Sequence, residues 1–219
     1  MRFISACLLF FSVASHAETP QETLELLSYR LSSSFDAFVF FEGQQQYLSQ
    51  VNNLLQQGEN LLNQSPENHG QLQQQWQQAK TLISNHHDSE NTQNTNNLDL
   101  LETEWTLLNS DIQQQIDQLK QPSYSSAKVE LQVELEKILS QYMQHSTASL
   151  GGFSALPGQD PMEEGIKRVD TLLASDFSDN QQLQRKWRFI RRPLLTYNTN
   201  SMPFIVLKVF DDMRQIIRT

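Results

Sequence analysis

The clearest helical pattern in the chain lies in residues 98–120, LDLLETEWTLLNSDIQQQIDQLK. Apolar residues recur in this stretch at alternating spacings of three and four, at Leu98, Leu101, Trp105, Leu108, Ile112, Ile116 and Leu119. This spacing places their side chains on one face of an α-helix, while glutamine and other polar residues occupy the opposite face. The segment therefore predicts an amphipathic helix that packs against other helices.

The same kind of pattern recurs on both sides of this segment. An amphipathic stripe runs through residues 20–64, which predicts one long helix or two collinear helices with a bend near Gly43. Trp76 and Trp187 each lie on a further apolar stripe of helical spacing. The helices expected outside 98–120 begin and end near residues 20–64, 71–84, 126–145, 160–174, 178–193 and 202–219.

Local signals indicate where several of these helices begin and end. Asp160-Pro161-Met162-Glu163 combines an N-cap, a first-turn proline and a capping-box glutamate, and Ser178 with Gln181 forms a second capping box. Pro193 should kink or end its helix. Polar and glycine-containing stretches predict loops at 85–97 and 147–159.

The composition also favours an all-α fold. The 219 residues include only seven glycines and seven prolines, and glutamine-rich runs alternate with leucine at helical spacing. We expect residues 18–219 to form an antiparallel bundle of about seven helices, either as one bundle or as two stacked bundles with a sub-boundary near 121–126.

The first seventeen residues resemble a signal peptide. Arg2 precedes an apolar run from Phe3 to Val13, and Ser15-His16-Ala17 offers small residues where a signal peptidase cuts. We expect cleavage after Ala17 and a periplasmic location; the alternative is a lipoprotein cleavage box ending at Cys7. Cys7 is the only cysteine, so the mature chain would hold no disulfide. No later apolar run is long enough to span a membrane.

Motifs for catalysis are missing from the sequence. The chain has no H-E-x-x-H, C-x-x-C-H, G-x-S-x-G or glycine-rich phosphate loop. The adjacent His86 and His87 could contribute to a metal site, but neighbouring residues at a helix end do not face one ion. We therefore expect no enzyme activity, no metal and no cofactor.

Charge is distributed unevenly along the chain. Residues 18–182 contain 23 acidic and 7 basic side chains, whereas residues 183–219 contain 2 acidic and 8 basic ones. The basic tail could pair with the acidic body within one fold, or it could form a surface for an anionic partner. The second interpretation selects a candidate interaction surface made of Arg185, Lys186, Arg188, Arg191, Arg192, Tyr197 and Asn198.

A resemblance is carried by the same segment. Residues 187–198 read W-R-F-I-R-R-P-L-L-T-Y-N, and M-P-F-I-V follows at 202–206. This pattern resembles the carboxy-terminal stretch of uncharacterised exported helical-bundle proteins of Gram-negative bacteria. The helix-rich layout is also similar to periplasmic sensor bundles of the type IV pili chemotaxis-transducer kind, although their glycine- and arginine-rich start is missing here. Neither resemblance implies an activity or a functional residue.

Two functions from different classes follow as expectations. The first is a non-catalytic protein-interaction module at the cell envelope, with the basic tail contacting an envelope protein or an anionic surface. The second is a sensory bundle that holds a small molecule between helices near Phe38 to Phe41 and Trp105. A nucleic-acid partner is not expected, because the basic segment lacks the motif context of a nucleic-acid reader.

Overall fold

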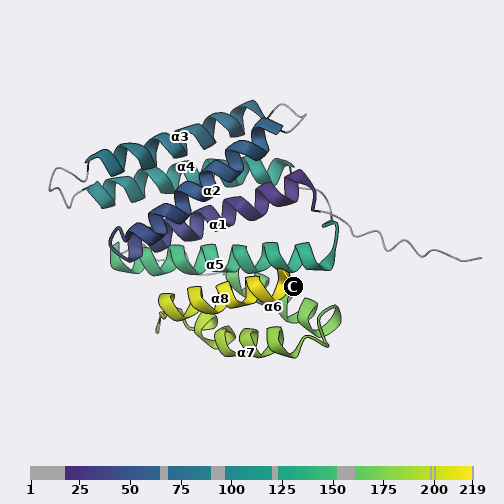
Figure 1. Ribbon diagram of the computed structural model, residues 1–219. Helices are drawn as coiled ribbons and strands as arrows, with labels where there is room; N and C mark the ends of the chain where they lie inside the picture. Colours follow the sequence, from purple (N-terminus) through teal and green to yellow (C-terminus); the bar gives the residue numbers. More distant parts are fainter. Residues whose placement is uncertain are drawn as a thin grey trace, which may run out of the picture.

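The computed structural model describes residues 18–64, 69–89, 97–119, 123–151, 161–197, 199 and 201–218. These residues form an all-α fold with eight helices and no strand (Figure 1). The helices are α1 (Pro20–Phe40), α2 (Gln45–Gln64), α3 (Gly70–Ser89), α4 (Asn97–Leu119), α5 (Ala127–Gly151), α6 (Pro161–Ser175), α7 (Gln181–Leu195) and α8 (Pro203–Arg218). Within this described part, no helix is both long and apolar enough to cross a membrane.

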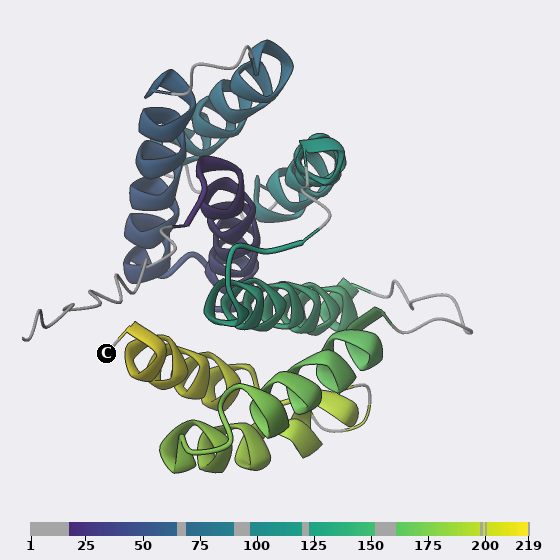
Figure 2. The same cartoon turned by 90° about the vertical axis from the view of Figure 1, so that its right-hand side faces the viewer.

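Two bundles lie one upon the other, with α1 against α5 where they meet (Figure 2). Helices α1 to α4 surround one hydrophobic core, whose largest buried side chains include Phe35, Trp76 and Trp105. Helices α5 to α8 surround a second core, which contains Tyr142 and Trp187. The expected helical bundle is therefore confirmed, in the form of two stacked bundles.

The expectation of one long or two collinear helices over residues 20–64 was wrong. Instead, α1 and α2 pack against each other, because the chain reverses at Glu42 and Gly43. These residues have φ angles of 53° and 81°, and their backbone N–H groups donate to Val39 and Phe38. This is the Schellman arrangement that ends many helices, and glycine adopts the left-handed backbone conformation at little cost.

Several predicted boundaries also differ from the structure. Helix α3 continues to Ser89, α4 begins at Asn97, and α5 continues to Gly151, so both polar stretches contribute residues to helices. Side-chain capping of α7 comes from Asn180, which accepts a hydrogen bond from Leu183 N at 3.0 Å, rather than from Ser178. Helix α7 also continues two residues past Pro193. The predicted cap at Asp160 and the signal peptide lie outside the described residues.

Helix α1 is buried on nearly every side, because it packs on α2, α4 and α5 at once. Its buried residues therefore include polar ones that an amphipathic stripe would leave exposed. Ser32, for example, accepts hydrogen bonds from Asn109 of α4 and Ser140 of α5. Asp36 is buried as well, and burial, assisted by the charge of Glu102, raises its pKa well above its usual range.

An ion cluster joins the two bundles. Glu136 of α5 is buried and accepts hydrogen bonds from Arg30 Nε of α1 at 2.8 Å and from Arg214 Nε of α8 at 2.7 Å. Burial by itself would raise the pKa of Glu136, but the charges and hydrogen bonds of the two arginines outweigh it and lower the pKa. The carboxylate consequently remains ionised in the interior.

Close packing inside the first bundle depends on a glycine. Trp76 of α3 is buried, and its indole N–H donates to the carbonyl oxygen of Leu55 at 2.8 Å. Its ring lies directly over Gly58 of α2, where an added Cβ would come within 2.1 Å of a ring carbon. Only hydrogen fits at that position.

We therefore expect Gly58→Ala to destabilise the protein. The methyl group overlaps the Trp76 ring, and overpacking of this kind costs about 1–3 kcal/mol, which exceeds the gain in helix propensity. Urea unfolding followed by circular dichroism measures the change. Ser49→Ala, at an exposed position of the same helix, is the control; equal stability of the two variants would contradict the prediction.

Glu136→Gln should destabilise the protein by about 3–5 kcal/mol at neutral pH, because it removes the buried carboxylate that pairs with the largely buried Arg30 and Arg214, of which Arg214 keeps Asp211 as a second partner. The lowered pKa of Glu136 also gives the effect a pH dependence. Its stabilisation is complete above the ordinary carboxyl pKa of 4.5 and is lost as the pH falls through the lower folded-state pKa. Unfolding free energies measured from pH 7 to pH 3 should therefore converge for the two proteins at the acid end.

Candidate interaction surface

The candidate residues lie on or directly after α7, and one face of this helix is fixed by the core. Leu183, Trp187, Ile190 and Leu194 recur at helical spacing and are all buried. They turn the opposite side of α7 toward solvent at the far end of the second bundle (Figure 1). The helix carries five basic side chains and no acidic one.

Two of the five cations are paired with carboxylates. Arg191 contacts Asp170 of α6, with its Nη2 atom 2.8 Å from Oδ2, and this hydrogen bond raises the pKa of Arg191. Asp170 also accepts a hydrogen bond from the indole N–H of Trp187 at 2.7 Å. Lys186 pairs with Asp212 of α8. These two side chains hold α7 against its neighbours, so we remove them from the candidate surface.

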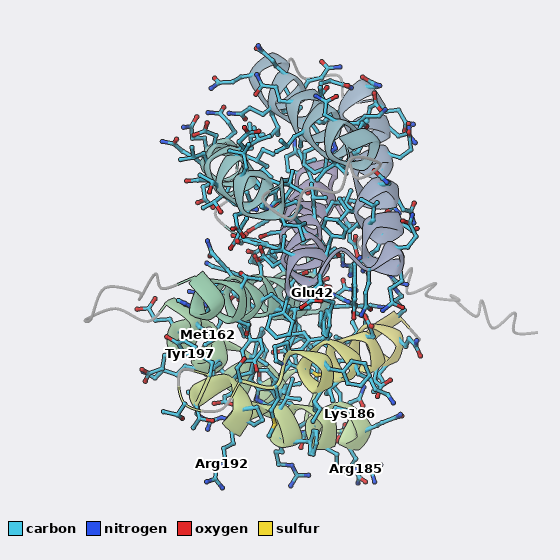
Figure 3. The ribbon with its side chains drawn as sticks, turned by 90° about the vertical axis from the view of Figure 1, so that its left-hand side faces the viewer. Glu42, Met162, Arg185, Lys186, Arg192 and Tyr197 are labelled. Atoms are coloured by element: carbon cyan, nitrogen blue, oxygen red, sulfur yellow. The ribbon has the colours of Figure 1, made fainter. Side chains whose placement is uncertain are left out.

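The other three cations face solvent. Arg185, Arg188 and Arg192 are exposed, and in the described part of the chain none of them forms an ion pair. Figure 3 shows Arg185 and Arg192 pointing away from the bundle. Phe189 and Leu195 lie on the same side and are 61% and 42% exposed. We call Arg185, Arg188, Phe189, Arg192 and Leu195 the α7 outer face.

The two remaining candidates do not join this face. Tyr197 stacks on His145 of α5, with ring centroids 4.7 Å apart, and is half-buried. Asn198 lies outside the described residues. Sequence reasoning omitted Phe189 and Leu195, although the spacing of Trp187, Ile190 and Leu194 already placed both on the opposite side of the helix.

The expected pairing of the basic tail with the acidic body is found for some residues only. Arg191 and Arg214 pair with Asp170 and Glu136, which both precede residue 183. The three arginines of the α7 outer face do not pair with carboxylates of the described residues. The pairing interpretation therefore holds for Arg191 and Arg214, and the surface for an anionic partner stays a prediction.

The second expected site, near Phe38 to Phe41 and Trp105, is only partly interior, because Phe40 and Phe41 are half-buried. Trp105 and Phe38 are buried, and the Trp105 ring stacks on Phe35 with centroids 4.3 Å apart. Phe41 stacks on Tyr47 at 5.0 Å. The small-molecule site between these helices stays a prediction.

Metal-binding groups are not brought together in the described residues, where no three histidine, cysteine or carboxylate side chains could hold one ion. The side chains of His86 and His87 lie outside that part. Comparison of the chain with models of protein families, with curated proteins and with solved structures gave no significant match. The resemblance of residues 187–206 to exported helical-bundle proteins stays a prediction.

Stability measurements should separate the paired cations from the exposed ones. Asp170→Ala is expected to cost about 1–3 kcal/mol, mainly because the buried indole of Trp187 loses its acceptor. Arg192→Ala should change the unfolding free energy by less than about 0.5 kcal/mol, because the side chain is exposed and forms no ion pair within the described ranges. Urea unfolding of both variants measures this, and an equal loss in both would show that Arg192 has a structural role.

Proposed function

We propose that this protein acts without catalysis, as a periplasmic interaction module that binds an acidic protein surface through the α7 outer face. The observation that carries the proposal is the set of three exposed arginines, which form no ion pair with the residues that the structure describes, beside two exposed apolar side chains. A cation whose only role is to keep the protein in solution would not need an exposed phenylalanine beside it.

The composition of this face favours a protein partner. Arginine binds carboxylates through two parallel hydrogen bonds, and arginine and aromatic residues are enriched at the centres of protein interfaces. Trp187 and the other apolar residues of α7 are used in the core, so the helix cannot insert its apolar face into a lipid surface. An anionic membrane remains an outcome that the experiment below detects.

Two observations support the proposed location. The first seventeen residues have the charge, apolar run and cleavage site of a signal peptide. The mature chain contains no cysteine, so it would fold in an oxidising compartment without disulfide exchange.

Photo-crosslinking in cells tests the proposal. A photoreactive residue at position 188 should give one dominant adduct, attached to a partner peptide that lies on an acidic surface. The same residue at Gln78, an exposed position of α3, is the control and should give no such adduct.

Charge reversal completes the test. Arg185→Glu with Arg192→Glu should remove the adduct from position 188, because both exposed cations become repulsive, while the circular dichroism spectrum stays unchanged. Persistence of the adduct in this variant, or an equal adduct from position 78, contradicts the proposal. Adducts with lipid alone would show that the α7 outer face binds the membrane surface and not an acidic protein.

A further inference from the structure

Helix α4 carries an exposed face that mirrors the α7 outer face. Leu100 and Leu107 are 58% and 68% exposed, and Glu104 and Asp111 are exposed between and beyond them. Spacings of four, three and four place these side chains along one side of the helix. Neither carboxylate forms an ion pair in the part of the chain that the structure describes. We call Leu100, Glu104, Leu107 and Asp111 the α4 acidic face.

The two faces have nearly equal length and matching order. At 1.5 Å per residue, the α4 acidic face is about 16 Å long and the α7 outer face about 15 Å. When the helices are aligned antiparallel, Asp111 meets Arg185, Leu107 meets Phe189, and Glu104 meets Arg192. Leu100 falls within one residue of Leu195. In a parallel alignment that starts from the first residue of each face, Leu100 would meet Arg185 and Glu104 would meet Phe189. Apolar side chains would then lie against charged ones.

The apolar members of the two faces are unusual for this protein surface. Among the described residues, six large hydrophobic side chains are exposed, and Leu100, Leu107, Phe189 and Leu195 are four of them. Exposed apolar side chains that line up with charged ones mark interaction surfaces more often than scattered ones do. Each face thus combines a charge of one sign with apolar area that the other face could cover.

The two faces cannot meet within one molecule. Helix α4 belongs to the first bundle and α7 to the second, and both views show α5 between them (Figures 1 and 2). A contact between the faces therefore requires two molecules. Because the faces are different surfaces, each molecule keeps one free face after pairing, and further copies can be added.

We propose that the partner of the α7 outer face is the α4 acidic face of a second copy of this chain, docked antiparallel in a head-to-tail contact. This proposal rests on the proposed function, since it names the acidic partner of the same surface. The contact builds a chain or a closed ring, according to the rotation between successive copies. Its ion pairs lie at the surface, so salt weakens it, and the net charge of −9 opposes close approach of the copies.

A charge-swap experiment tests this proposal. Sedimentation velocity of the purified protein at about 50 mM salt should show species larger than the monomer, and these should decrease as the salt concentration rises. One variant carries Arg185→Glu with Arg192→Glu, and the other carries Glu104→Arg with Asp111→Arg. Each alone should be monomeric, with self-association weakened at least about tenfold, because each opposes like charges across the contact.

Mixing the two variants should restore the larger species, because the reversed α7 face of one now meets the reversed α4 face of the other. Lys128→Glu with Lys208→Glu is the control: it changes the net charge by the same amount as the α7 reversal, lies outside both faces and should self-associate like the native protein. Circular dichroism confirms that every variant is folded.

Two results would overturn the inference. One is a native protein that stays monomeric at low salt up to about 100 µM; the other is self-association that survives either charge reversal. In both cases, an adduct from position 188 with a different protein would leave the proposed function standing. If position 188 gave no adduct either, both the proposed function and the self-association would be contradicted.

Discussion

The contact between α1 and α5 is the constraint on which the rest of the structure depends, and Glu136 is at its centre. Arg30 of α1 and Arg214 of α8 both donate to this buried carboxylate, so one charge ties together three helices from two bundles. A buried charge without partners would cost several kcal/mol, so the interior tolerates the Glu136 carboxylate only when the two arginines pair with it. That requirement fixes the register of α1 against α5 more narrowly than apolar packing alone, which tolerates small shifts.

The stacking of two bundles also decides which surfaces are available for contacts. Helix α1 is buried on nearly every side, whereas α4 and α7 lie in different bundles and each keeps one side exposed. Acidic side chains consequently remain exposed on α4 and basic ones on α7. A molecule with opposite charges on two separate surfaces is suited to contacts that differ at its two ends.

The apolar stripes predicted most helices because burial on one side produces a period of 3.6 residues. They were least informative for α1, where Ser32 and Asp36 are buried rather than exposed and Ser32 accepts hydrogen bonds from α4 and α5. Boundaries were missed where the deciding interaction is backbone geometry, as at Glu42 and Gly43, or where several residues could supply the cap, as at Asn180. Pro193 did not end α7 because a proline close to a helix end removes few backbone hydrogen bonds.

The sequence by itself determined that the chain is helical and that α7 carries cations on every side except the one facing the core, since both follow from local spacing. It could not show which of those cations are available. Arg191 and Arg192 are neighbours of the same type, yet Arg191 reaches Asp170 of α6 and Arg192 points into solvent. Only the tertiary structure decided this, because a salt bridge between two helices needs its side chains within about 4 Å of each other, and that distance is set by how the helices pack.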